Sequence, residues 1–127
     1  MVEKPKVYFT KEISSEKLIE LYEKLDIKLQ GNIAVKVHSG EKGNQNFLRP
    51  EFMKPLVDYL DGTIVETTSS GPEHFSERTT YEKHKKLLEE HGWTKVFKKV
   101  EILDTEQPDE EIDIPNGIML KKKLYWK

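Results

Sequence analysis

Segments typical of β-strands alternate with segments typical of α-helices along most of this sequence, and this order constrains the fold more than any other feature. Helices that connect successive strands must cover the sheet those strands form. The alternation therefore predicts a three-layer α/β domain with a mainly parallel sheet, helices on both faces and right-handed crossovers. One domain of residues 1–127 suits this length. Strands are expected at residues 6–10, 32–38, 62–66 and 94–103, and helices at residues 15–25, 50–60 and 80–91.

One strand, loop and helix unit is especially clear. Residues 62–66 read as a short buried strand, residues 67–76 are polar, and residues 80–91 repeat apolar side chains at helical spacing. Thr79 and Glu82 fit a capping box at the start of that helix. A loop that follows a strand in this way commonly carries the ligand site of an α/β sheet.

Two residues interrupt patterns that are otherwise regular. Residues 32–38 form an apolar run typical of a strand covered on both faces, but Lys36 lies within it. Such a lysine either extends its amine to the rim of the sheet or holds an anion. The helix of residues 50–60 begins well with Pro50, whereas Pro55 lacks an amide hydrogen in the second turn. A kink or a short 3₁₀ segment is expected there.

The C-terminal region is expected to add a β-hairpin to the core of residues 1–103. An acidic loop at residues 104–109 leads into the hairpin of residues 110–127, whose tight turn is centred on Asn116 and Gly117. The hairpin either covers an edge of the sheet or pairs with a second subunit, so a homodimer through residues 110–127 is a candidate assembly. Its apolar side chains are Ile112, Ile114, Ile118, Leu120, Leu124 and Trp126.

Composition limits the partners and the location. The chain has 21 basic and 23 acidic residues, so it lacks the basic excess that attracts nucleic acid. No apolar run is long enough to cross a membrane and the first residues lack the core of a signal peptide, so a cytoplasmic protein is expected. The absence of cysteine excludes disulfides, cysteine-ligated zinc and cysteine-ligated iron–sulfur clusters within this chain.

Four segments carry a family resemblance. They are residues 6–13, residues 40–50, residues 61–66 and residues 90–93. In this order they resemble the N-terminal part of the domain-of-unknown-function 362 family, whose members are often described as iron–sulfur centre proteins. Relatives tend to have cysteine and asparagine where this chain has Thr67 and Thr68, and many continue into cysteine-rich repeats. The resemblance therefore implies a short or truncated member without an iron–sulfur cluster.

A small anionic ligand is the partner that the loops favour. Ligands of open α/β sheets bind beyond the carboxyl ends of the strands, where the strand order reverses. Hydroxyls, arginines and the amides of glycine-rich loops at those ends could hold an anion, although neither loop has a phosphate-loop or dinucleotide motif. The residues expected to bind it are Gly40, Asn46, Arg49, Glu66, Thr68, Ser69, Ser70 and Arg78.

A metal version of this site would use His38 and His74 together with Glu66. No pair of histidines has the H-x-x-x-H spacing that fixes two ligands of one ion on a helical face, and His84 and His91, seven residues apart, are too far apart to chelate one ion. Histidines of this kind are more often surface or packing residues, so that interpretation is favoured and no cofactor is expected.

The alternative function is a non-catalytic dimerisation or protein-interaction module. It is supported by the lack of a recognisable nucleophile, base and orienting group, although whether the chain is an enzyme stays open. Substitution separates the two hypotheses. Arg49→Ala or Arg78→Ala is expected to leave folding intact and remove ligand-induced stabilisation, whereas Trp126→Ser is expected to change the mass in solution.

Overall fold

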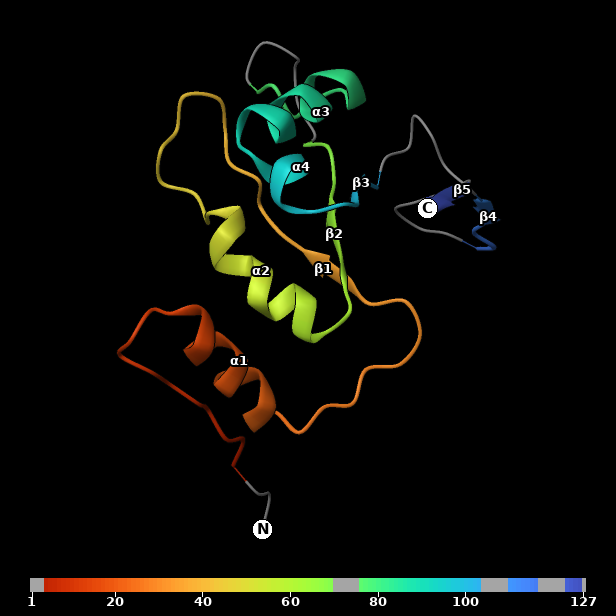
Figure 1. Cartoon of the computed structure of the whole chain (residues 1–127). Coiled ribbons are helices and arrows are strands. Elements are labelled where there is room, and N and C mark those ends of the chain that lie inside the picture. The colour runs from red at the N-terminus through yellow and green to blue at the C-terminus, as the bar shows by residue number, and fades with distance from the viewer. Residues whose placement is uncertain (1–3, 70–75, 104–109, 117–122, 127) are drawn as a thin grey trace.

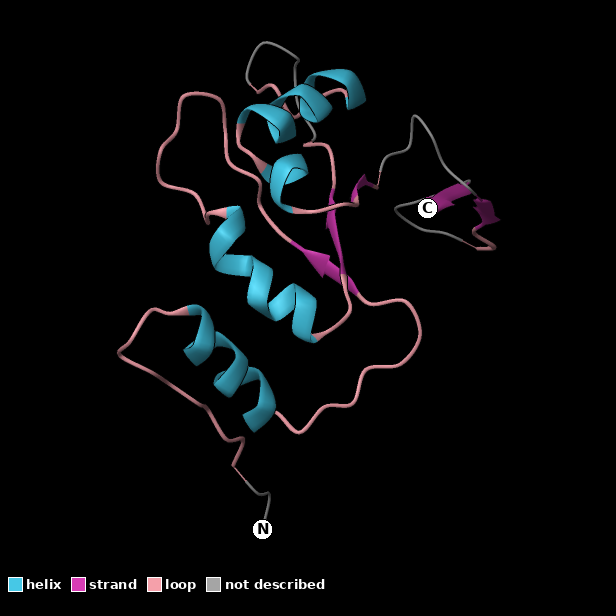
Figure 2. Ribbon diagram, in the orientation of Figure 1, coloured by secondary structure: helices cyan, strands magenta, loops and turns pink. Residues whose placement is uncertain are grey.

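The computed structural model describes residues 4–69, 76–103, 110–116 and 123–126. Three strands and most of the helices form an α/β fold (Figures 1 and 2). No helix among these residues is long and apolar enough to cross a membrane. The elements are α1 (Ser15–Lys24), β1 (Ala34–Lys36), α2 (Pro50–Tyr59), β2 (Thr63–Glu66), α3 (Tyr81–Glu90), α4 (Trp93–Val96), β3 (Val100–Ile102), β4 (Glu110–Asp113) and β5 (Lys123–Trp126).

The central sheet is parallel, as the alternation predicts. Its strand order is β1-β2-β3, with α2 connecting the first pair and α3 and α4 connecting the second. This order follows the chain, so these three strands contain no point where the order reverses. Ala34 and Lys36 of β1 are exposed. The expectation that this strand is covered on both faces is therefore wrong.

The core lies between one face of the sheet and the helices α2, α3 and α4. Val35, Ile64 and Val100 share that face because paired residues of a parallel sheet point the same way. Burial of this apolar surface holds the sheet to its helices. The buried cluster consists of Val37, Met53, Leu56, Val57, Ile64, Leu88, Trp93, Phe97 and Ile102.

Helix α1 packs on α2, on the side away from the sheet (Figure 1), and not on the sheet as expected of a helix between two strands. The Ser14 hydroxyl caps it by accepting from the amide of Lys17. The Ser15 hydroxyl donates to the carbonyl oxygen of Phe52 at 2.8 Å and ties the two helices together. None of the α1 residues is buried, so this helix is the outermost layer.

The strand expected at residues 6–10 is absent. These residues have no regular secondary structure, and the side chains of Val7 and Phe9 are 88% and 80% exposed. A β-branched and aromatic pattern makes a strand only where a neighbouring strand supplies the hydrogen-bond ladder. This segment has no such neighbour among the described residues.

The structure departs from the sequence expectations at two points in the helices. Helix α2 is α-helical from Pro50 to Tyr59, so the 3₁₀ alternative expected at Pro55 is absent, and Met53, Leu56 and Val57 on either side of the proline are buried. Helix α3 is capped by Thr80, whose hydroxyl accepts from the amide of Lys83, and not by the neighbouring threonine. Burial of α2 against the rest of the protein explains the continuous helix. A shift of the start of α3 by one residue explains the different cap.

The segment of residues 94–103 is not one strand. It begins with the short helix α4, whose first residue Trp93 is fully buried, and only Val100–Ile102 join the sheet. Gly92 makes this possible because its φ of 82° lies in the left-handed region, which lets α3 end and α4 begin at once.

Strands β4 and β5 pair antiparallel and form a second sheet beside the first (Figure 2). The register pairs Glu110 with Trp126 and Asp113 with Lys123, which leaves residues 114–122 between the strands. The register is not centred on the turn expected at Asn116 and Gly117, but Gly117 lies outside the described residues and that turn stays a prediction. Residues 104–109 and 117–122 lie outside the described residues, so the acidic loop, the complete hairpin and the single-domain boundaries stay predictions.

Candidate functional site

Glu66 is the centre of a polar cluster at the carboxyl end of β2. Its side chain is fully buried, yet both oxygens are well supplied with donors. Oε1 accepts from the amide and the hydroxyl of Ser39, at 2.8 and 2.9 Å. Oε2 accepts from Nζ of Lys36 at 2.7 Å and from the amide of Thr67 at 2.9 Å. The carboxylate thus joins the ends of two neighbouring strands, β1 and β2.

The donors keep Glu66 ionised. Burial alone raises the pKa of this carboxyl, but the nearby His84 imidazole, 3.7 Å away, and hydrogen bonds from Lys36 and the amides of Ser39 and Thr67 outweigh burial. The net effect holds the pKa of Glu66 well below the ordinary value of 4.5. A negative charge is therefore fixed inside the domain near neutral pH.

Arg78 joins the two loops that follow β1 and β2. Its guanidinium lies 3.2 Å from Oε1 of Glu66, 3.0 Å from Oε1 of Glu41 and 2.9 Å from Nε2 of His38. The side chain is only 9% exposed. Its backbone carbonyl accepts from the amide of Ser69 at 2.8 Å. Arg78 is thus held on all sides and is not a free surface cation.

Glu41 completes this ion-pair network. Its second oxygen accepts a 2.6 Å hydrogen bond from the hydroxyl of Ser76. Burial raises the pKa of Glu41, but the contacts with Ser76 and Arg78 outweigh burial and leave the pKa below its ordinary value. Two carboxylates, Glu41 and Glu66, therefore balance the two cations Arg78 and Lys36.

Ser39, His84 and Glu66 have the residue types of a catalytic triad, but the hydrogen bonds between them run in a different direction. The Ser39 hydroxyl donates to Glu66, so its oxygen accepts from Nε2 of His84 at 3.2 Å. In a triad the serine would instead donate to the histidine. All three side chains are 0% exposed. This arrangement positions the buried carboxylate and gives substrate no access to the hydroxyl.

His38 lies between two hydrogen-bond donors. The amide of Gly40 points at Nδ1 from 3.1 Å, and Nη1 of Arg78 lies 2.9 Å from Nε2. A neutral imidazole has one acceptor nitrogen and one N–H group, and a guanidinium can only donate. The ring can therefore satisfy only one of its two neighbours at a time.

An aromatic stack supports the loop after β1. The rings of Phe47 and His91 are stacked with centroids 4.3 Å apart, and Arg49 lies over Phe47 at 4.2 Å. Nδ1 of His91 donates to the carbonyl oxygen of Ser39 at 2.9 Å. Gly40 lies under this stack with φ at 95°, and a Cβ there would lie 2.7 Å from the Phe47 ring.

The structure brings together three of the eight residues expected to bind a ligand. Glu66, Arg78 and Gly40 meet at the carboxyl edge, with the metal candidate His38 beside them. Sequence reasoning missed Ser39, Glu41 and His84 as partners. The signal for His84 was its place on the buried stripe of α3.

The other expected residues lie around this cluster or beyond it. Asn46 and Arg49 are exposed on the loop after β1, Ser69 contributes only its amide, and the half-buried Thr68 follows β2. Ser70 and His74 lie outside the described residues. Among those that are described, no three histidine, cysteine or acidic side chains are grouped to hold a metal ion. The metal version of the site stays untested.

Comparison with known families identifies the chain. Residues 33–125 match the domain of unknown function DUF362. The chain belongs to the DUF362 family. The match in this DUF362 chain spans the three-stranded sheet and all the polar residues around Glu66, and it confirms the resemblance seen in the sequence. No curated protein and no solved structure matches the chain.

Proposed function

We propose that this DUF362 chain is a binding domain for a small anionic ligand, and that the ligand occupies the carboxyl edge of the sheet. The observation that carries this proposal is an excess of hydrogen-bond donors around Arg78. Gly40 and Arg78 both point a donor at the His38 imidazole, which can accept from only one of them, although Nη1 of Arg78 also donates to Oε1 of Glu41 at 3.0 Å. Nε of Arg78 is buried and has no hydrogen-bond partner among the described residues.

Unsatisfied donors in a buried cluster are costly, and an oxyanion relieves that cost. A buried N–H group without an acceptor destabilises the fold by about 1 to 3 kcal/mol. A carboxylate or phosphate oxygen near Arg78 supplies the missing acceptor. Lys36, whose side chain is 50% exposed, adds a cation at the rim of the same cluster.

The charges of the cluster limit which anions fit. Glu66 and Glu41 already neutralise Arg78 and Lys36. The site therefore favours a singly or doubly charged small ligand over a polyanion, because a larger negative charge would meet both carboxylates. We expect the exposed Arg49 and Asn46 to contact the part of the ligand outside the cluster.

A thermal-shift comparison tests this proposal. Phosphate, acetate and oxalate, each added at constant ionic strength, are expected to raise the melting temperature of the unmodified protein. Lys36→Ala is expected to remove that rise, because it removes the cation at the rim and leaves the other donors to Glu66 in place. Lys24→Ala, at the end of α1, is the matched control. An equal rise in both variants would contradict binding at the carboxyl edge.

A second candidate function is dimerisation or docking on a partner protein through residues 110–127. Strands β4 and β5 form a separate two-stranded sheet, and such a pair is marginally stable unless it packs on another surface. Ile112 of β4 is 45% exposed. If this pair is an interface, Ile112→Lys should halve the mass measured by light scattering, whereas a monomeric unmodified protein would rule out the homodimer.

A further inference from the structure

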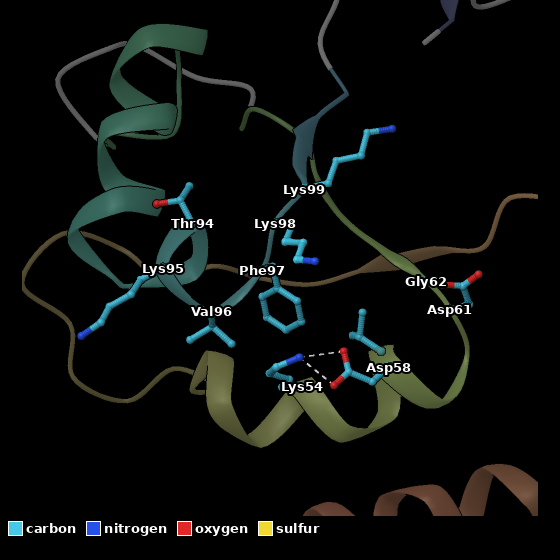
Figure 3. Close-up of a pocket in the computed structure, with 11 residues that line it drawn as sticks. Lys54, Asp58, Asp61, Gly62, Thr94, Lys95, Val96, Phe97, Lys98 and Lys99 are labelled. Atoms are coloured by element: carbon cyan, nitrogen blue, oxygen red, sulfur yellow. Dashed lines mark hydrogen bonds and ion pairs between the residues drawn. The ribbon is translucent and has the colours of Figure 1, made fainter.

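A further cavity lies between α2 and the chain around α4 (Figure 3), at the edge of the sheet opposite the Glu66 cluster. It has a volume of about 690 Å³ and opens between α2 and the segment that links α4 to β3. Gly62 and Lys99, which immediately precede β2 and β3, both line it. The cavity is therefore at the amino ends of the strands, where neither sequence motifs nor the family match suggest a site.

The floor of this cavity is apolar. Val57 of α2 and Phe97 after α4 are 3% and 7% exposed, and Val96 is half-buried beside them. Figure 3 shows Phe97 and Val96 pointing across the cavity toward the α2 residues Lys54 and Asp58. An aromatic ring and two valines offer a surface on which the apolar part of a ligand can lie.

The rim carries an excess of positive charge. Four lysines and two aspartates line the cavity, which gives a formal charge of +2. Lys54 forms an ion pair with Asp58 at 2.6 Å, and Lys99 forms one with Glu101 outside the cavity at 2.6 Å. Lys95 and Lys98 have no ion-pair partner in the part of the chain that the structure describes.

We propose that this cavity is a second binding site, for a small organic anion with an apolar body. The body lies on Phe97 and the acidic group is held by Lys98, with Lys95 adding to the positive potential. The lysine excess disfavours cationic ligands, and the carboxylates of Asp58 and Asp61 disfavour anions with many charges. The cavity volume falls within the range of about 300 to 1,000 Å³ that is usual for small-molecule sites.

The sulfonate 8-anilinonaphthalene-1-sulfonate is a suitable probe, because it joins an apolar body to one negative charge. Its fluorescence is followed in titrations of folded protein, with the fold of each variant checked by near-ultraviolet circular dichroism. Lys98→Glu is expected to weaken binding about fivefold to tenfold, since it reverses an exposed charge beside the ligand. Lys98→Gln is expected to have a smaller effect in the same direction.

Two control variants decide where the probe binds. Lys85→Glu makes the same charge change on the exposed side of α3 and is expected to leave the affinity unchanged. Lys36→Ala changes the carboxyl edge of the sheet and is expected to leave the affinity for the probe unchanged. Equal loss in Lys98→Glu and Lys85→Glu, or loss only in Lys36→Ala, would overturn this second site. Neither result depends on whether the Glu66 cluster binds an anion.

Discussion

Nη2 of Arg78 lies 3.2 Å from Oε1 of Glu66, and this contact joins the loop after β2 to the end of β2 itself inside the protein. The carboxylate is fully buried and the arginine side chain is 9% exposed. A buried ion pair of this kind contributes little net stability but is costly to break, because the remaining charge loses its partner. The consequences can be measured.

Replacing Arg78 should destabilise the protein strongly. Arg78→Ala leaves Glu66 buried with one cation fewer, so we expect a loss of about 3 kcal/mol or more in the free energy of unfolding. Arg49→Ala is the matched control, because that arginine is exposed and its contacts are the Phe47 ring and the carbonyl oxygen of Gln45 in its own loop. Arg49→Ala should lower the free energy of unfolding by about 1 kcal/mol or less. Urea denaturation measures both, and equal losses would show that Arg78 is not a structural residue.

This result would correct the expectation drawn from sequence, which treated both arginines as ligand residues whose removal leaves folding intact. Sequence could place Arg78 in the loop after a strand, because the strand pattern of β2 and the helix pattern of α3 are strong. It could not show that the side chain points inward, because that depends on Glu41 and His38 from another loop. Long-range pairing of this kind leaves no local pattern.

Acid should destabilise the protein partly through Glu66. The pKa of this carboxyl lies below 4.5 in the folded protein, so its contribution is complete above the ordinary pKa and is lost as pH falls toward the folded value. Unmodified protein should therefore lose stability steadily below about pH 4.5. Glu66→Gln should be less stable near neutral pH and should lose less stability over that acidic range. Parallel pH profiles from urea denaturation would contradict this assignment.

Gly40 should tolerate a side chain less well than Gly43. Both have positive φ values, 95° and 77°, so alanine costs backbone strain of about 1 to 2 kcal/mol at either position. At Gly40 the new Cβ would also lie 2.7 Å from the Phe47 ring, whereas at Gly43 nothing lies within 4 Å. Gly40→Ala should therefore unfold at a lower urea concentration than Gly43→Ala. The reverse order would show that the stack over Gly40 is not tightly packed.

The fold was more predictable than the site. Parallel β1, β2 and β3 follow from the apolar runs and the helices between them, which are local signals. Residues 6–10 have the same composition as a strand but no neighbour to pair with, so propensity alone gave the wrong result there. Residues 94–96 belong to helix α4 and not to the expected strand, because the burial of Trp93 at the start of that helix outweighs the strand pattern of residues 94–103. Both errors come from tertiary context.

The most direct test of the central claim is the ¹⁵N nuclear magnetic resonance signal of Nε–H in Arg78 during titration with inorganic phosphate. Binding at the carboxyl edge predicts a saturable shift of this signal and slower exchange of its hydrogen with water, because the buried donor gains an acceptor. The titration should give the same midpoint as the His38 ring signals. An Arg78 signal that stays unchanged while phosphate stabilises the protein would contradict the claim.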